Sequence, residues 1–245
     1  MYELGSLVIQ GLSLSSEDLA KPVRRLKMVF GKLFSLFGKK PGKIEYDEEA
    51  LAQWYEDKSA IMERVLGEEH NMVMHAIIPY DIGGGLDLYY YPHGIQGVGV
   101  GTKELCETPD SGSSNDQFGA YELVMFTRHT LNLDEAKDGD TDFGKAHATI
   151  NAVLNVMAPY SAQATLNHND TSEFPAEMET IGGKCFILQA YGWSGKPEPF
   201  GVLAVIEVFR SEMDFAREHG TPMLVEKLEA SGYFPYSDLD RDPVV

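Results

Sequence analysis

The order of helical and strand-like segments is the feature of this sequence that most constrains its fold. One helical segment is followed by several adjacent strand-like runs, a second helical segment, two more strand-like runs and two closing helices. Because strand and helix do not alternate strictly, we predict an α+β domain in which helices cover a mixed, mainly antiparallel sheet. The helices are expected at 47–66, 142–160, 211–220 and 221–232, and the strands at 72–79, 86–92, 97–105, 121–131, 184–193 and 201–209.

The stretch GGGLDLYYYPHG, Gly83 to Gly94, joins three glycines to three tyrosines. A phosphate-binding loop needs glycines that lead into a helix N-terminus, whereas a strand-like run follows here. We therefore predict a glycine turn before a strand and no nucleotide site. Alternate side chains of a strand face opposite sides. One face would enter the core, and the other, with Tyr89 and Tyr91, would meet either a second layer or a partner.

The charge of the chain is strongly acidic and unevenly distributed. The 245 residues carry a net charge of −18, but residues 21–40 hold seven Lys and Arg and no acid, which leaves −25 for the rest. Nucleic acid is excluded as a direct partner on this ground, because its phosphates would be repelled. A basic protein would be attracted and its encounter accelerated.

An N-terminal extension is expected at 1–42, ahead of one folded domain at 43–245. Its apolar residues recur every three or four positions on one face of a basic amphipathic helix: Val23, Leu26, Phe30, Leu33 and Phe37. The following GKKPGK reads as a linker. Such a helix can pack on the domain, associate with a second copy or lie on an anionic membrane, as in a membrane-peripheral adaptor.

Motifs for catalysis and metal binding are incomplete. The stretch YGWSGK around Ser194 has Lys196 where a nucleophile elbow needs its second glycine, and the stretch 138–144 has Phe143 where a calcium loop needs glycine. The seven histidines have no zinc spacing. We predict no catalytic residue, no metal ligand and no cofactor. The alternative that stays open is a small hydrolase or metal-dependent enzyme whose scattered His and Asp side chains converge in the fold.

The cysteines and the apolar runs favour a cytoplasmic protein. Cys106 and Cys185 stand far apart without a CxxC motif, so reduced thiols are expected. No N-terminal run resembles a signal peptide, and no segment is long enough to span a bilayer.

Three stretches resemble the suppressor of fused domain family. They are FGAYELVMFTRHTL (118–131), AHATINAVLNVMAPYSAQATLNHND (146–170) and EPFGVLAVIEVFRSEMDFAREHG (198–220). The run from Ile77 to Leu105 is similar to the start of the family domain. The resemblance covers about Lys43 to Gly232.

The resemblance implies a non-enzymatic domain that binds proteins. Animal members clamp a short peptide of Gli-type transcription factors between two domains, and this chain ends shortly after the first, so the same ligand does not follow. Bacterial single-domain relatives are proposed to be immunity proteins, and an inhibitor of a basic toxin would suit the acidic domain. The family also places polar binding residues in the loop after the long helix, which implies a protein-binding site at Tyr160, His168 and Asp170. The other interpretation is that these residues only cap the loop and stabilise its turns.

Overall fold

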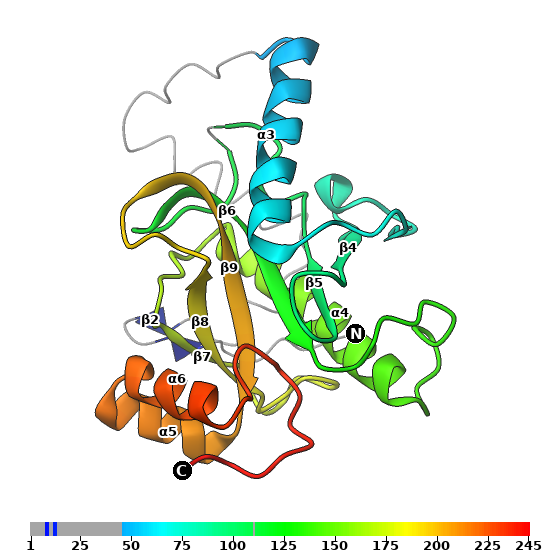
Figure 1. Cartoon of the computed structure of the whole chain (residues 1–245). Coiled ribbons are helices and arrows are strands. Elements are labelled where there is room, and N and C mark those ends of the chain that lie inside the picture. The colour runs from blue at the N-terminus through cyan, green and yellow to red at the C-terminus, as the bar shows by residue number, and fades with distance from the viewer. Residues whose placement is uncertain (1–7, 10–11, 14–45, 110) are drawn as a thin grey trace.

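A computed structural model describes residues 8–9, 12–13, 46–109 and 111–245, and its strands form one sheet (Figure 1). The strands are β1 (Val8–Ile9), β2 (Leu12–Ser13), β3 (Val73–Met74), β4 (Leu88–Tyr91), β5 (Val98–Gly101), β6 (Phe118–Thr127), β7 (Thr171–Glu173), β8 (Cys185–Tyr191) and β9 (Glu198–Val208). The helices are α3 (Glu48–Leu66), α4 (Asp142–Ser161), α5 (Arg210–His219) and α6 (Thr221–Ala230), with a short 3₁₀ turn, η2 (Tyr80–Ile82).

The strand order in the sheet is β2-β1-β7-β8-β9-β6-β5-β4-β3. Among the described strands, β6 and β9 run parallel and every other neighbouring pair is antiparallel. The predicted α+β class with a mixed, mainly antiparallel sheet is therefore confirmed. The basic helix expected before residue 43 lies outside the described residues.

The parallel pair β6 and β9 forms the centre of the core. Every residue of β9 from Phe200 onward is buried, as is every residue of β6 except Gly119. Strands buried on both faces read as continuous apolar runs without alternation, which explains the sequence pattern at 201–209. The two carboxylates in these runs, Glu122 and Glu207, are buried and need partners.

Helices α3 and α4 cover opposite faces of the sheet, as two adjacent tyrosines of β4 show. The Tyr90 hydroxyl lies 2.9 Å from Nε2 of His147 on α4. The Tyr91 hydroxyl lies 3.9 Å from the sulfur of Met62 on α3. Because neighbouring strand residues face opposite sides, the second face of β4 meets a second layer of this protein. Helices α5 and α6 pack side by side near β7 and β8 (Figure 1).

The strand predicted at 72–79 is wrong beyond Met74. The side chain of Asp87 replaces the strand ladder there, since its carboxylate accepts the Ala76 N–H at 2.8 Å and lies 2.6 Å from Nδ1 of His75. The chain then turns through η2 to the glycines. A Cβ on Gly84 would stand 1.7 Å from the Ile78 carbonyl oxygen, so this close approach requires glycine. Strand β4 follows, which confirms the predicted glycine turn.

Most helix ends follow the sequence signals. Asp47 caps α3, because its carboxylate accepts the Ala50 N–H at 2.8 Å, and Gly67 ends that helix. Helix α5 begins at Arg210, one residue before the predicted start at Ser211. The reason is that the Glu212 carboxylate accepts the Phe209 N–H at 2.9 Å, which makes Phe209 the capping residue.

Candidate functional site

Three loops meet at the end of the sheet where β6 and β9 begin. The parallel register pairs Phe118 with Glu198, so the loop 111–117 before β6 and the loop 192–197 before β9 lie side by side. The loop 162–170, which follows α4, joins them through the hydrogen bonds given below. We call the surface formed by Asn115–Gln117, Asn167–Asp170 and Trp193 the polar loop surface.

Side-chain amides bind two of these loops to each other. The Asn115 side chain donates to the Leu166 carbonyl oxygen at 2.8 Å, and the Asp116 N–H donates to Oδ1 of Asn167 at 3.0 Å. The His168 N–H donates to Oε1 of Gln117 at 2.9 Å. These bonds satisfy backbone groups that a strand ladder does not reach, so both loops are held in one conformation.

His168 connects this surface to the third loop. Its Nδ1 accepts the Ala190 N–H at 3.2 Å, which places the proton of the neutral ring on Nε2. The ring lies 5.4 Å from the Trp193 ring, centroid to centroid. Burial lowers the pKa of His168. The side chain of His168 is therefore a neutral, half-buried ring that lies beside the half-buried ring of Trp193.

Asp170 ends the loop 162–170, whereas Tyr160 lies in the last turn of α4, just before the loop begins. Oδ2 of Asp170 accepts the Asn167 N–H at 2.7 Å, which is the capping role that we considered as the alternative to binding. Burial, and then the negative charge of Asp170, raises the pKa of the half-buried Tyr160. Of the three predicted residues, His168 and Asp170 lie in the loop, whereas Tyr160 belongs to the helix before it. Their role in binding stays a prediction.

The sequence did not point to Gln117 or Trp193. Gln117 meets His168 across 51 positions of sequence, and Trp193 lies beside His168 because β7 and β8 pair in antiparallel register. A glutamine in a glycine- and serine-rich loop carries no spacing signal of its own. The one available signal is a large aromatic ring in a Gly- and Pro-rich turn, which is typical of contact surfaces.

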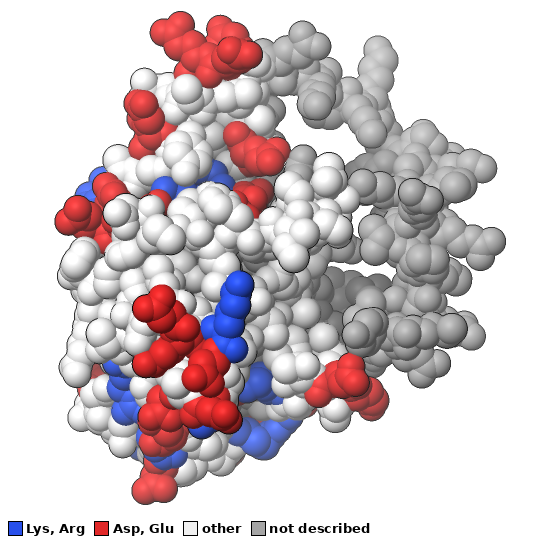
Figure 2. All heavy atoms as spheres, turned by 90° about the vertical axis from the view of Figure 1, so that its right-hand side faces the viewer, with Lys and Arg blue, Asp and Glu red and all other residues white. Residues whose placement is uncertain are grey.

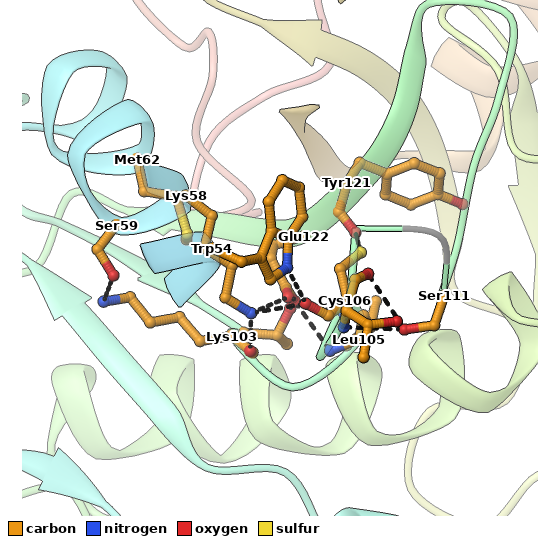
Figure 3. Close-up of polar contacts among 12 residues, drawn as sticks. Trp54, Lys58, Ser59, Met62, Lys103, Leu105, Cys106, Ser111, Tyr121 and Glu122 are labelled. Atoms are coloured by element: carbon orange, nitrogen blue, oxygen red, sulfur yellow. Dashed lines mark hydrogen bonds and ion pairs between the residues drawn. The ribbon is translucent and has the colours of Figure 1, made fainter. Parts of the chain in front are cut away.

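A buried ionic network lies under α3 (Figure 3). Nζ of Lys58 lies 3.2 Å from Oε1 of Glu122 and donates to the carbonyl oxygens of Lys103 and Cys106. The Glu122 carboxylate also accepts the N–H of Cys106 at 3.1 Å and the hydroxyl of Thr102 at 2.7 Å. Both charged groups are thereby paired and hydrogen-bonded, as burial requires.

The network fixes the segment after β5 between α3 and β6. Indole Nε1 of Trp54 donates to the Cys106 carbonyl oxygen at 2.9 Å, and its ring meets the Phe200 ring edge-on. Burial raises the pKa of the Cys106 thiol to about 12. A thiol with such a pKa stays protonated, so Cys106 is a packing residue here.

A pocket of about 290 Å³ opens at the opposite end of the central strands, near Phe126 and Glu207. Nζ of Lys184 lies 2.6 Å from Oε1 of Glu207. Burial raises the pKa of Glu207, although Lys184 opposes this shift. His129, Asp142 and Asp238 also line the pocket, so some of the scattered histidine and aspartate residues do converge.

In the described part of the chain, no three His, Cys, Asp or Glu side chains stand together as the ligands of a metal ion would. None of its helices combines the length and the apolar character needed to cross a lipid bilayer.

Comparison with known proteins identifies the fold. No protein-family model and no curated protein matches the sequence. Among solved structures, the chain of the Sufu–Fu complex is similar at a TM-score of 0.50 and 12% identity, over 80% of this chain and 92% of that chain. The predicted resemblance is confirmed at the level of the fold, which is suppressor-of-fused-like.

Two other solved structures are similar. A SUFU (suppressor of fused protein) homolog from Neisseria gonorrhoeae FA 1090 has 11% identity and a TM-score of 0.48, over 79% of this chain and 98% of that chain. Drosophila Suppressor of Fused has 14% identity and a TM-score of 0.45, over 76% of this chain. The match spans 49% of the Drosophila chain, about half of its length.

Proposed function

We propose that this chain is a non-enzymatic protein-binding domain that contacts its partner through the polar loop surface. The observation that carries the proposal is the convergence of three loops, which presents His168, Asp170 and Trp193 together on one rigid surface. Preorganised loops lose little conformational entropy on binding. The similar chain solved in the Sufu–Fu complex supports the use of this fold in a protein complex.

The chemistry of the surface suits a polar or basic partner. Asp116 is exposed, and Asp170 is half-buried beside Tyr160. Trp193 can supply apolar contact area, while the amides and carboxylates around it supply hydrogen bonds. A basic side chain of the partner would therefore make apolar contacts with Trp193 and hydrogen bonds with the carboxylates in one patch.

The finer proposal is that the domain is an immunity protein, an inhibitor that neutralises a basic toxin by direct binding. The net charge of −25 outside residues 21–40 supports it, because such a charge accelerates the encounter with a basic protein. Neutralisation by tight binding would need no catalytic group.

Co-expression with the product of the adjacent gene tests this proposal. We expect that product to slow growth when it is expressed alone, and we expect this chain to restore growth and to co-purify with it in a stoichiometric complex. Asp116→Lys should weaken both effects, whereas Glu226→Lys, at an exposed site on α6, is the matched control for the change in charge. A neighbour that neither binds nor inhibits growth would contradict the immunity role.

The pocket near Glu207 favours a second candidate function, a small hydrolase. It brings His129, Asp142 and Asp238 to one cavity with a buried carboxyl whose pKa is raised. Chromogenic carboxylic and phosphoric esters would test it. Turnover that is lost in Glu207→Gln would favour the enzyme, and an absence of turnover at high protein concentration would count against it.

A further inference from the structure

Three side chains of the polar loop surface turn an acceptor toward the protein and leave a donor without a partner. They are Gln117, Asn167 and His168. In each of them an acceptor atom binds a backbone N–H of this chain, and one side-chain nitrogen has no hydrogen bond to any of the described residues. These donors belong to one patch, because two of the residues are consecutive and the third binds one of them.

The three unpaired nitrogens can be reached from outside the protein. Among the described residues, the buried side-chain atoms that lack a partner are the hydroxyl oxygens of Tyr121 and Ser172 and Nε of Arg241. An unpaired nitrogen in any of the three residues named above is therefore not buried. Water or a partner protein can accept a hydrogen bond from each of them.

The two amide groups have a fixed orientation. Oε1 of Gln117 accepts the His168 N–H at 2.9 Å, and Oδ1 of Asn167 accepts the Asp116 N–H at 3.0 Å. An amide nitrogen cannot replace either oxygen, because it only donates hydrogen bonds. The NH₂ group is therefore the free end of both side chains.

The His168 ring also presents a donor. Its Nδ1 accepts the Ala190 N–H at 3.2 Å, so this nitrogen carries no proton. Burial lowers the pKa of His168, so the ring is neutral at pH 7 and its one proton is on Nε2. A partner that binds to this nitrogen must offer an acceptor.

The acceptor that suits these donors is uncharged. Asp116, which follows Asn115 and precedes Gln117, is exposed, and Oδ2 of Asp170 lies 2.7 Å from the Asn167 backbone nitrogen. Both carboxylates repel an anionic group of a partner. A backbone carbonyl oxygen is neutral and has two lone pairs that can accept hydrogen bonds. The patch is therefore suited to the main chain of a protein.

The acidic charge of the chain does not by itself select the polar loop surface. The face of the molecule in Figure 2 carries several separate groups of Asp and Glu side chains. A basic partner is therefore attracted to the domain as a whole. The place where it binds must be decided by hydrogen bonds and apolar contacts at one surface.

We propose that Gln117, Asn167 and His168 form a donor set that binds backbone carbonyl oxygens of the protein partner. The partner must then present a segment whose carbonyl groups are not used in its own helices or strands. The donor set holds the main chain of this segment, and the neighbouring carboxylates attract its basic side chains. This inference rests on the proposed function, since it names the group that the protein-binding surface recognises.

The first test uses the full chain alone. We expect ¹⁵N NMR of the His168 ring at pH 7 to show a neutral imidazole with its proton on Nε2. A proton on Nδ1 would rule out the donor set, because His168 would then present an acceptor at its surface nitrogen. This measurement needs no partner.

The second test is Gln117→Glu, which keeps an oxygen for the His168 N–H and replaces the NH₂ donor with a second acceptor. Calorimetric titration with the co-purifying product of the adjacent gene should show an affinity at least about tenfold below that of the wild type. The added negative charge alone would strengthen the binding of a basic partner. The direction of the change therefore separates the hydrogen bond from the charge.

The matched control is Gln96→Glu, which adds the same charge at an exposed glutamine before β5, and its affinity should not fall. A Gln117→Glu variant that binds as tightly as the wild type, or more tightly, would overturn the proposal. A wild-type chain that does not bind the product would contradict the proposed function instead. In that case the position of the His168 proton still tests the donor set.

Discussion

At the scale of single residues, the pair Lys58–Glu122 connects the core to α3. Both side chains are almost fully buried, and Glu122 additionally accepts hydrogen bonds from the Cys106 N–H and the Thr102 hydroxyl. Buried charges are costly unless they are paired, so loss of one partner affects stability more than loss of both.

We predict that Glu122→Gln lowers the free energy of unfolding by about 3–5 kcal/mol, because it leaves the Lys58 ammonium buried without its counter-charge. The double variant Lys58→Met/Glu122→Gln should lose less than the sum of the two single variants. Urea unfolding measures both effects. Glu173→Gln, at the exposed ion pair with Arg210, is the control and should cost less than about 1 kcal/mol. A Glu122→Gln cost as small as that of the control would contradict this role.

His147 is the buried histidine of α4. Its Nδ1 lies 3.1 Å from the Ala136 carbonyl oxygen, and its Nε2 lies 2.9 Å from the Tyr90 hydroxyl, so the neutral ring donates to the first and accepts from the second. Burial lowers the pKa of His147 in the folded state. The unfolded chain therefore binds the proton at a higher pH than the folded chain does.

It follows that the contribution of His147 to stability is present above the unfolded pKa of about 6.5 and is lost as the pH falls below it. We predict that the free energy of unfolding decreases from pH 7 to pH 5 less steeply in His147→Gln than in the wild type. Thermal or urea unfolding across this range provides the measurement, with the exposed His93→Gln as control. Equal slopes in His147→Gln and the wild type would refute the prediction.

At the scale of elements, the loop 162–170 is ordered by one strained residue. Asn169 has φ at +72° and is the described non-glycine residue with positive φ. Its N–H donates to the Leu188 carbonyl oxygen at 2.8 Å, and its own carbonyl oxygen accepts the Thr221 hydroxyl at 2.7 Å. These bonds connect the polar loop surface to β8 and α6.

We predict that Asn169→Ala is less stable than Asn169→Gly by about 1 kcal/mol. Both variants lose the bond from Gln189, so the difference between them isolates the left-handed backbone, which alanine disfavours. Urea unfolding gives the stability, and hydrogen exchange at the Asn169 amide should be faster in the alanine variant. An alanine variant as stable as the glycine variant would show that this conformation imposes no constraint.

Elements with a strong local pattern could be predicted from the sequence, and those set by distant partners could not. The apolar run of β9 and the caps of α3 carry their own signals, and both were located correctly. The strand predicted at 72–79 ends at Met74 because Asp87, a residue of the next segment, takes its hydrogen bonds. The predicted loop contains His168 and Asp170, but its contacts with Gln117 and Trp193 depend on the sheet topology.

At the scale of the whole molecule, the proposed contact uses one end of a suppressor-of-fused-like sheet. The polar loop surface lies where β6 and β9 begin. The acidic charge of the chain outside residues 21–40 attracts a basic partner to this surface. Raising the salt concentration should therefore weaken the contact.

The central claim is that the polar loop surface binds a protein. Calorimetric titration of the co-purifying partner into wild-type and variant chains tests this claim most directly. We predict a one-to-one complex whose affinity falls at least about tenfold, a loss of about 1.4 kcal/mol, in Trp193→Ala and in Asp116→Lys. Affinity should be unchanged in Glu226→Lys. A complex that forms with wild-type affinity in both polar loop variants would contradict the account.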